Sequence, residues 1–398
     1  MMPNGAISIR PPGKFFIGKG LLAELGSYAQ AFGNRAYVIC DKFILERAIA
    51  EAGPSFGERG SAVFGKFRHE CTRIEINRNR EMARSVKAEL IVGIGGGKTL
   101  DTAKAVACHE RLPVLTVPTT ASSDAACTAR ALIYTLSSEF DRCMLLPSAP
   151  DLVLADTEIL AAAPARLFVA GIGKALATYF EVRACYRAQA ERRVPPRAAR
   201  TALASARLCL DSLLENAVQA RLDVERQRSS RALEAVLEAT VYLSGVSADG
   251  GGRAAAHAIH NGMLAVPALQ QARHGEKMAF ALLAQLVLER APQEEIATLL
   301  DFSRAVGLPL GLRELGVRTF AEAQWRRVAE RACEKNARAW ATCPSRSRRT
   351  TSTGPSARPM PWPTSTGRPA SVRPWRWPAA EPDAGVDGAR LPKAAAPE

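Results

Sequence analysis

The first 156 residues alternate between short apolar runs and segments with helical periodicity, and this alternation constrains the fold more than any other feature. The apolar runs are rich in β-branched and aromatic residues, which is typical of buried strands. They read FFIG, AYVIC, SAVFGKF, LIVGIGGG, VLTVPTT and LVLAD. Segments such as LLAELGSYAQAFG and TLDTAKAVACHE, which lie between them, have the spacing of helices. Strands that alternate with helices form parallel sheets covered on both faces, so we predict an α/β domain over residues 1–156.

The pattern changes at residue 157. The segments that follow carry apolar residues at a period of about 3.6 and few strand signals. They include EILAAAPARLFVAGIGKALATYFEVRAC, AARTALASARLCLDSLLENAVQA, RALEAVLEATVYLSGV, GEKMAFALLAQLVLERA and PQEEIATLLDFSRAVG. We therefore predict an all-helical second domain over residues 157–335.

Several function classes are excluded at this stage. No run of 18 apolar residues is present, so we expect no membrane-spanning helix. The chain begins without a continuous apolar segment, so we expect no secretory signal. The nine cysteines are scattered, their number is odd, and none forms a CxxC pair. This usage indicates a reducing compartment, and we expect a cytoplasmic protein.

A glycine-rich stretch, Gly93–Asp101, follows the apolar run LIV and precedes a helical pattern. Glycines allow the backbone to approach a pyrophosphate closely, and the amides of the following helix N-terminus then face the phosphates. The spacing is neither GxGxxG nor that of a P-loop, so a plain strand–helix turn is the alternative. Three consecutive glycines favour phosphate binding.

Small hydroxyl residues follow the next apolar run, in VPTTASSDAACTARALIYT over residues 117–135. Their side chains could bind a ribose or an amide group. Asp124 lies among them and has no basic neighbour in sequence. On this evidence alone, the side chain could cap a helix or bind a substrate.

Three of the five histidines, His257, His260 and His274, fall within 18 residues. His257 and His260 are three apart in a helical pattern and so share a face, while His274 opens the next helical pattern. Two imidazoles from neighbouring helices could hold a divalent metal together with a carboxylate from elsewhere. Buried, hydrogen-bonded histidines are the alternative.

Together, IVGIGGGKTLDTAKAVA, PTTASSDAACTARALIYT, AGIGKALATYFEVRAC and AAAHAIHNG…HGEKMAF resemble the glycerol dehydrogenases of the iron-containing (group III) alcohol dehydrogenase superfamily, from about residue 6 to 335. The resemblance implies a Rossmann-like N-terminal domain and a helical C-terminal domain, the architecture that dehydroquinate synthases share. It also implies a cleft between them that holds NAD, zinc and glycerol.

The resemblance also implies roles for individual residues. Asp124 would bind the substrate hydroxyls and act in catalysis, and His257 and His274 would be metal ligands. Arg130 stands where the family usually has an apolar residue. The residues implied to bind the cofactor are Asp41, Gly95, Gly96, Gly97, Lys98, Thr99, Leu100, Asp101, Thr119, Thr120, Ala121, Ser122, Thr128, Arg130 and Tyr134.

Lys174 departs from the family pattern, because it takes the place of the aspartate in AGxGDALAT that would be the third metal ligand. A lysine there removes an oxygen ligand and adds a positive charge beside a dication. We therefore expect weak zinc binding and impaired activity. A sequencing error or a harmless surface lysine is the alternative.

The last segment, residues 336–398, departs in composition. It holds four of the five tryptophans, 11 of the 25 prolines, and 10 Arg and Lys against four Asp and Glu. This composition predicts disorder. Codons built from the third base of each codon and the first two of the next can recode residues 342–366 to MPFEVTPDDVYGAIxAADALADVY, which resembles the family's C-terminal text. We infer a frameshift between residues 334 and 341, so the net charge of +14 does not indicate nucleic-acid binding.

The sequence thus predicts NAD-dependent oxidation of glycerol to dihydroxyacetone, impaired by Lys174 and the altered C-terminus. A related polyol or alcohol dehydrogenase and a non-catalytic NAD-binding protein remain open. We expect a small polyol substrate, a homo-oligomer, and neither nucleic acid nor membrane as a partner.

Overall fold

The computed structural model describes residues 8–58, 60–191 and 198–335, all of which belong to one compact unit. The predicted frameshifted segment, residues 336–398, lies outside the described residues. No helix in the described part of the chain is long and apolar enough to cross a membrane.

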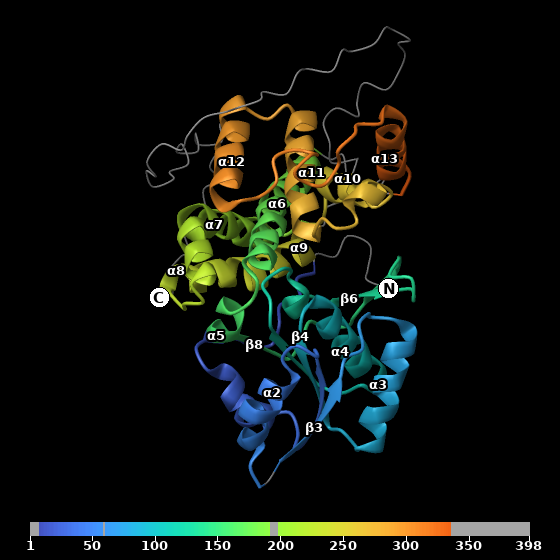
Figure 1. Cartoon of the computed structure of the whole chain (residues 1–398), viewed down its shortest axis with the longest axis vertical. Coiled ribbons are helices and arrows are strands. Elements are labelled where there is room, and N and C mark those ends of the chain that lie inside the picture. The colour runs from blue at the N-terminus through green and yellow to red at the C-terminus, as the bar shows by residue number, and fades with distance from the viewer. Residues whose placement is uncertain (1–7, 59, 192–197, 336–398) are drawn as a thin grey trace, which may run out of the picture. The chain divides into compact units, whose positions relative to one another are not determined.

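A six-stranded parallel sheet forms the first part of the chain (Figure 1), and all six predicted strands are present. The order across the sheet is β1-β8-β5-β4-β2-β3, and every neighbouring pair is parallel. The strands are β1 (Phe15–Gly18), β2 (Arg35–Cys40), β3 (Ser61–Lys66), β4 (Leu90–Gly95), β5 (Val114–Pro118) and β8 (Leu152–Asp156).

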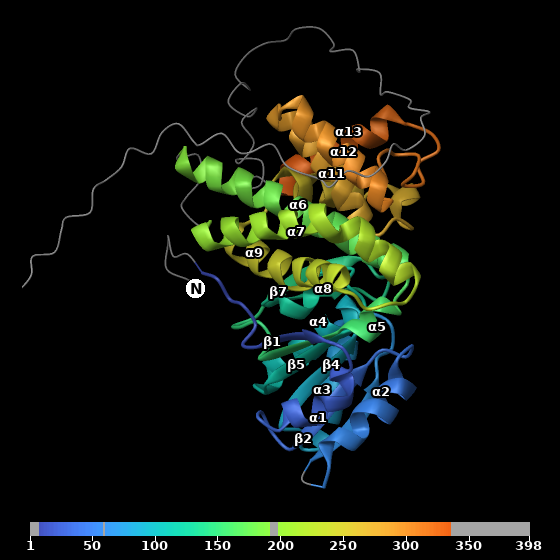
Figure 2. The ribbon, with the colours of Figure 1, turned by 90° about the vertical axis from the view of Figure 1, so that its left-hand side faces the viewer.

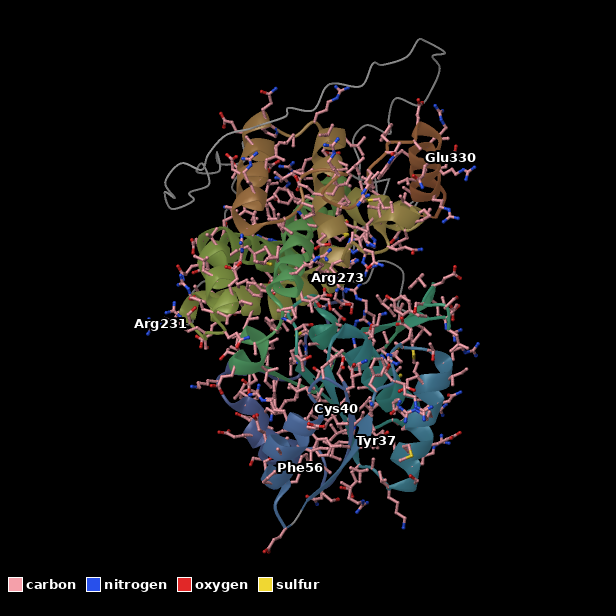
Figure 3. All side chains as sticks on the ribbon, viewed as in Figure 1. Tyr37, Cys40, Phe56, Arg231, Arg273 and Glu330 are labelled. Atoms are coloured by element: carbon pink, nitrogen blue, oxygen red, sulfur yellow. The ribbon has the colours of Figure 1, made fainter. Side chains whose placement is uncertain are left out.

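Both faces of this sheet are buried, because successive side chains of its central strands enter different cores. Tyr37 and Ile39 of β2 pack with residues of α3 (Arg73–Ser85) and α4 (Gly97–Glu110). Val38 and Cys40 pack in a second core that includes Phe56 and residues of α1 (Leu25–Ala29) and α2 (Leu45–Ala52). Figure 3 labels three of these side chains, Tyr37, Cys40 and Phe56. Burial on both faces explains why the strands are continuously apolar.

A two-stranded antiparallel hairpin was not predicted. It consists of β6 (Arg130–Tyr134) and β7 (Phe140–Leu145) and has an irregular register between Ile133 and Tyr134. Most of β7 is exposed, so its sequence FDRCML lacks the apolar pattern that revealed the other strands.

From Thr157 onward the described residues form helices and no strand. The long helices α6 and α7 run side by side (Figure 2), and α11 packs against α6. Strands give way to helices at the predicted position, and the division into two domains there stays a prediction. The helices are α5 (Thr157–Ala161), α6 (Ala165–Ala190), α7 (Arg200–Glu225), α8 (Arg231–Leu237), α9 (Ser244–Gly251), α10 (Ala255–Met263), α11 (His274–Glu289), α12 (Gln293–Val306) and α13 (Glu322–Lys335), with a π-helical segment η4 (Glu238–Leu243) between α8 and α9.

The connections of the sheet reverse direction between β2 and β4. From β2 the chain moves outward to β3, whereas from β4 it moves the opposite way to β5. In open α/β sheets, ligands bind beyond the carboxyl ends of the strands at such a switch point. The fold therefore places the ends of β2 and β4, and the loops that follow them, at the expected ligand position.

Candidate functional site

The glycine-rich turn joins β4 directly to α4. Gly96 caps the helix, and the amide of Leu100 donates to its carbonyl at 3.1 Å. A Cβ placed on Gly96 would meet only Thr120 Oγ1, at 3.9 Å, so the turn faces open space. The first-turn amides of a helix have no partners within it and attract anions. The geometry of this turn thus suits a phosphate group.

Asp41 follows β2, beside this turn. Its amide donates to the carbonyl of Ile94 at 2.9 Å, which ties the end of β2 to the end of β4. The carboxylate of Asp41 accepts from the amide of Phe43 at 3.3 Å and is half-buried. A hydroxyl-bearing ligand that lies across the switch point could reach this side chain.

Hydroxyl residues after β5 complete the same edge. The amide of Thr119 donates to the carbonyl of Gly95 at 3.0 Å, and Thr120 Oγ1 lies 3.1 Å from Ser122 Oγ. All three hydroxyl side chains are half-buried, so they remain accessible to a ligand.

The other side chains that the sequence implied for cofactor binding differ in exposure. Lys98 is exposed, and its ammonium lies 2.5 Å from Glu70 and 5.4 Å from the ring centroid of Tyr134. Asp101 is buried, and its carboxylate accepts from Lys104 at 2.8 Å and from the amide of Leu132 at 3.0 Å. The Asp101 side chain therefore stabilises the protein interior. The side chains of Ala121, Thr99, Leu100 and Thr128 are also buried.

Lys174 is buried on α6, with 5% of its surface exposed, so the surface-lysine alternative is wrong. Its ammonium forms an ion pair with Asp124 and donates to Ser244 Oγ at 3.2 Å. Asp124 lies at the N-cap position of a short 3₁₀ turn but its side chain caps nothing there. Lys174, which stands where the resemblance implies a metal ligand, thus pairs with Asp124, the carboxylate predicted to bind the substrate.

The electrostatics of Asp124 follow from this pairing. Burial alone would raise the pKa of its carboxyl group, but the charges of Lys174 and Arg130 outweigh burial and lower the pKa below its ordinary value. Asp124 is therefore ionised at neutral pH. It lies next to Ser123, whose Oγ would be 3.1 Å from a Cβ on Gly97, so this pair adjoins the turn at the start of α4.

The three clustered histidines lie together. The ring centroids of His257 and His274 are 6.2 Å apart, within the distance that two metal ligands can span. His274 Nδ1 lies 2.9 Å from His260 Nε2. His274 opens α11, where Glu276 fixes the helix start by accepting from the amide of Arg273 at 2.7 Å.

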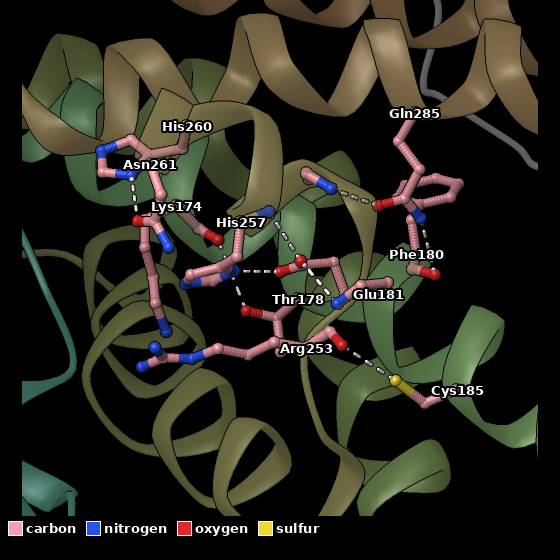
Figure 4. A network of polar contacts seen from close by, with 12 residues as sticks. Lys174, Thr178, Phe180, Glu181, Cys185, Arg253, His257, His260, Asn261 and Gln285 are labelled. Atoms are coloured by element: carbon pink, nitrogen blue, oxygen red, sulfur yellow. Dashed lines mark hydrogen bonds and ion pairs between the residues drawn. The ribbon is translucent and has the colours of Figure 1, made fainter. Parts of the chain in front are cut away.

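Glu181 was missed by the sequence reasoning. It is buried on α6, and Figure 4 shows it against His257, whose Nδ1 lies 2.5 Å from Glu181 Oε2. The other carboxylate oxygen accepts from the amides of Ala254 and His257, at 2.9 and 3.0 Å. Burial raises the pKa of Glu181 to about 7. The signal available was its spacing, because Glu181 follows Lys174 by seven residues on the same helical face.

The histidines are neutral in this environment. Burial is the largest cause that lowers the pKa of His257 and of His274 well below the ordinary value, and nearby positive charge adds to it. Burial likewise lowers the pKa of His260 to about 3. Neutral imidazoles are potential metal ligands. Nevertheless, in residues 8–58, 60–191 and 198–335 no three His, Cys, Asp or Glu side chains are placed so that they could hold a metal ion.

Arg253, two residues before the start of α10, adds positive charge to the surroundings of Asp124. Its charge adds to those of Lys174 and Arg130 in lowering the pKa of the Asp124 carboxyl group. Arg253 is exposed to solvent, and crowding of its guanidinium by protein atoms, followed by the charge of Arg130, lowers its pKa to about 10. Sequence reasoning did not single out this residue.

Known proteins resemble this chain over most of its length. The family model of iron-containing alcohol dehydrogenase matches residues 12–157. A glycerol dehydrogenase of Escherichia coli O6:H1 is 48% identical over 82% of this chain and 89% of its own length, and one of Pseudomonas putida is 46% identical over 82% and 90%. The crystal structure of a probable glycerol dehydrogenase from Sinorhizobium meliloti superposes with a TM-score of 0.77, at 37% identity, over 83% of this chain and 92% of that one.

Proposed function

Since the chain belongs to the glycerol dehydrogenases of the iron-containing alcohol dehydrogenase family, we propose that it oxidises glycerol to dihydroxyacetone with NAD, and that Lys174 makes this reaction slow. The observation that carries the proposal is the pairing of Lys174 with Asp124 beside a turn suited to phosphate binding.

The residues around this turn support NAD as the cofactor. The amides at the start of α4 would face its pyrophosphate, and the carboxylate of Asp41 would accept from its ribose hydroxyls. A 2′-phosphate at the same place would face that carboxylate, so NADP should bind more weakly. When bound, NAD supplies the acceptor for the hydride.

The residues present do not fit the zinc ion that the family resemblance implies. His257 and His274 could each supply a nitrogen, but the third position holds an ammonium group that is already paired with Asp124. Two imidazoles beside a positive charge make a weak site for a dication. The alcohol proton of glycerol would therefore pass to this chain's own groups, and Lys174 is the cation that pairs with the carboxylate predicted to bind the substrate.

The test combines binding and turnover. We expect calorimetry to show tighter binding of NAD than of NADP, and we expect slow NADH formation from glycerol that a chelator does not reduce further. Stoichiometric zinc with normal, chelator-sensitive turnover would contradict the role given to Lys174. NAD binding without turnover of any polyol would indicate the non-catalytic alternative.

A further inference from the structure

Lys98 forms an ion pair at the turn that would bind phosphate. It is the second residue of α4, after Gly97, and its ammonium lies 2.5 Å from the carboxylate of Glu70 and 5.4 Å from the ring centroid of Tyr134. The N-terminus of a helix is the positive end of its dipole, so a cation in the first turn is unfavourable unless an anion lies nearby. Glu70 supplies that anion here.

Glu70 lies in the loop between β3 and α3, which reaches the same edge of the sheet as the glycine-rich turn. The amide of Phe67 in this loop donates to the carbonyl of Cys40, directly before Asp41, at 2.8 Å. The carboxylate of Glu70 also accepts from the amide of Cys71 at 3.2 Å, and the Glu70 side chain is only 10% exposed. The carboxylate is therefore held in place next to the start of α4.

Lys98 is the exposed partner of this pair, because 51% of its side chain is accessible. Exposed ion pairs contribute little to stability, since water and salt screen them. A hydrogen bond from an ammonium to a phosphate oxygen is charge-assisted and strong, and the neighbouring amides of α4 attract the same anion. The ammonium can therefore exchange Glu70 for a phosphate, whereas the buried end of the pair stays in place.

We propose that Glu70 competes with the pyrophosphate of the cofactor for Lys98. When NAD or NADH binds, the ammonium turns from Glu70 to the pyrophosphate at the start of α4, and the carboxylate loses its partner. Glu70 therefore lowers the affinity for both nucleotides and speeds their release. The proposal rests on the proposed NAD-dependent activity and adds to it a residue that the family resemblance did not assign.

Two other roles for Glu70 predict different results. If Glu70 instead positioned Lys98 for the pyrophosphate, removing its charge would weaken nucleotide binding. If Lys98 stayed on Glu70 throughout, the carboxylate would act only by repelling the phosphates. Removing its charge would then have no larger effect with Lys98 present than with Lys98 absent.

Titration of the full chain with NADH, followed by fluorescence at about 0.15 M salt, distinguishes these roles. At this ionic strength charges more than about 8 Å apart are largely screened. We expect E70Q to bind NADH about two- to fivefold more tightly, the range that loss of an exposed pair allows. We expect K98M to bind it about tenfold more weakly, because a charge-assisted hydrogen bond is lost.

The double variant E70Q/K98M completes the cycle. Relative to K98M alone, E70Q should tighten NADH binding by less than it does in the unmodified chain, because no ion pair remains to be broken. Stopped-flow measurement should show that E70Q slows NADH dissociation.

Glu89 provides the matched control. It pairs with Arg35 at 2.6 Å, the cation of that pair is 50% exposed, and both residues lie at the amino ends of the strands, at the opposite edge of the sheet. E89Q should leave the NADH affinity unchanged.

Weaker or unchanged NADH binding in E70Q, an equal gain from E70Q with and without Lys98, or an unchanged dissociation rate would each overturn the proposal. Failure of the unmodified chain to bind NADH or NAD would instead overturn the dehydrogenase function on which the proposal rests. The same set of titrations therefore separates the two failures.

Discussion

Lys174 lies on the same face of α6 as Thr178, four residues later, and Glu181, seven residues later. Thr178 Oγ1 donates to the carbonyl of Lys174 at 3.3 Å, and Glu181 contacts His257. A carboxylate at position 174 would therefore lie on the helix face that also carries Glu181, the partner of His257. We expect the length and charge of this one side chain to determine whether these groups can bind a dication.

We expect K174D to gain zinc. The substitution supplies an oxygen ligand near His257 and His274 and removes the opposing charge, so zinc affinity should rise by more than the roughly 10–100-fold that a single supporting contact contributes. Metal analysis after dialysis measures the zinc content of both proteins.

K174M is the matched control, because it removes the charge without adding a ligand. It should remain zinc-poor. Stoichiometric zinc in K174M, or in the unmodified chain, would show that the two imidazoles suffice and that the argument from the third ligand is wrong.

A second residue-scale prediction concerns Asp41. D41N should narrow the preference for NAD over NADP, because the carboxylate that would repel a 2′-phosphate becomes neutral. The measurement is the ratio of the two dissociation constants, and D151N, which changes an aspartate at the opposite end of the sheet, serves as the control. An unchanged ratio in D41N would remove Asp41 from the cofactor site.

At the scale of single residues, the sequence revealed the candidate site residues that lie within short motifs. Asp124, the three histidines and the anomalous Lys174 could each be found from local text. Glu181 had only its helical spacing from Lys174 as a signal, because its contact with His257 joins residues 76 positions apart. The buried pairing of Lys174 with Asp124 likewise spans 50 positions and has no local signal.

At the scale of elements, two glycines allow α6 to approach its neighbours. A Cβ on Gly171 of α6 would overlap the carbonyl oxygen of Ala121, and a Cβ on Gly275 of α11 would overlap that of Ala170. Helix α6 therefore contacts backbone directly on the loop after β5 and at the start of α11. His274 precedes Gly275, so the second contact also sets the position of an imidazole.

We expect G275A to destabilise the protein by about 1–3 kcal/mol, as overpacking in well-packed interiors does, and to weaken any metal site that includes His274. G53A is the control, because a Cβ there would meet nothing within 4 Å and the backbone already has a helical conformation. G53A should be neutral or stabilise by about 0.4–1 kcal/mol. Urea unfolding measures both, and equal stabilities for G275A and G53A would contradict the close packing.

Lys104 ties α4 to the residues that carry Asp124. Its ammonium is fully buried, pairs with Asp101 at 2.8 Å and donates to the carbonyls of Ala125 and Thr128 at 2.7 and 3.2 Å. The turn that would bind phosphate and the loop that would bind substrate are thus held by one cation.

K104M should cost about 3–5 kcal/mol of unfolding free energy, because it leaves Asp101 buried without its partner. By contrast, K19M breaks an exposed pair with Glu158 and should cost about 0–1 kcal/mol. Denaturant titration compares the two, and similar losses would mean that the buried pair contributes no more than an exposed one.

The sequence revealed elements to the extent that burial imposed a pattern on them. The six parallel strands are apolar along their whole length because helices cover both faces, and all six were found. The β6–β7 hairpin has an exposed, polar second strand and was missed. The segment 231–246 was predicted as helical throughout, but a π-helical turn, η4, interrupts it, and hydrophobic spacing does not reveal such a change of hydrogen bonding.

At the scale of the whole molecule, the sequence predicted a change from strands to helices at about residue 157, and in the structure β8 ends at Asp156 and α5 begins at Thr157. Composition also separated residues 336–398 from the rest of the chain. From this composition we predict that limited proteolysis removes these residues first and leaves a fragment that ends near residue 335. Mass spectrometry of the early fragments identifies the cut sites, and a first cut within residues 8–191 would contradict the prediction.

The ion pair between Lys174 and Asp124 joins a residue of the helical part to one in the loop after β5, whereas Asp41 and the turn proposed to bind phosphate lie on the sheet part alone. Natural selection can therefore act on the two functions separately. If the proposed sites are right, a lineage that acquires a new residue on α6 changes the substrate side and still inherits its nucleotide recognition. In such a protein, a substitution that removes the ancestral activity can also be the first step toward another one.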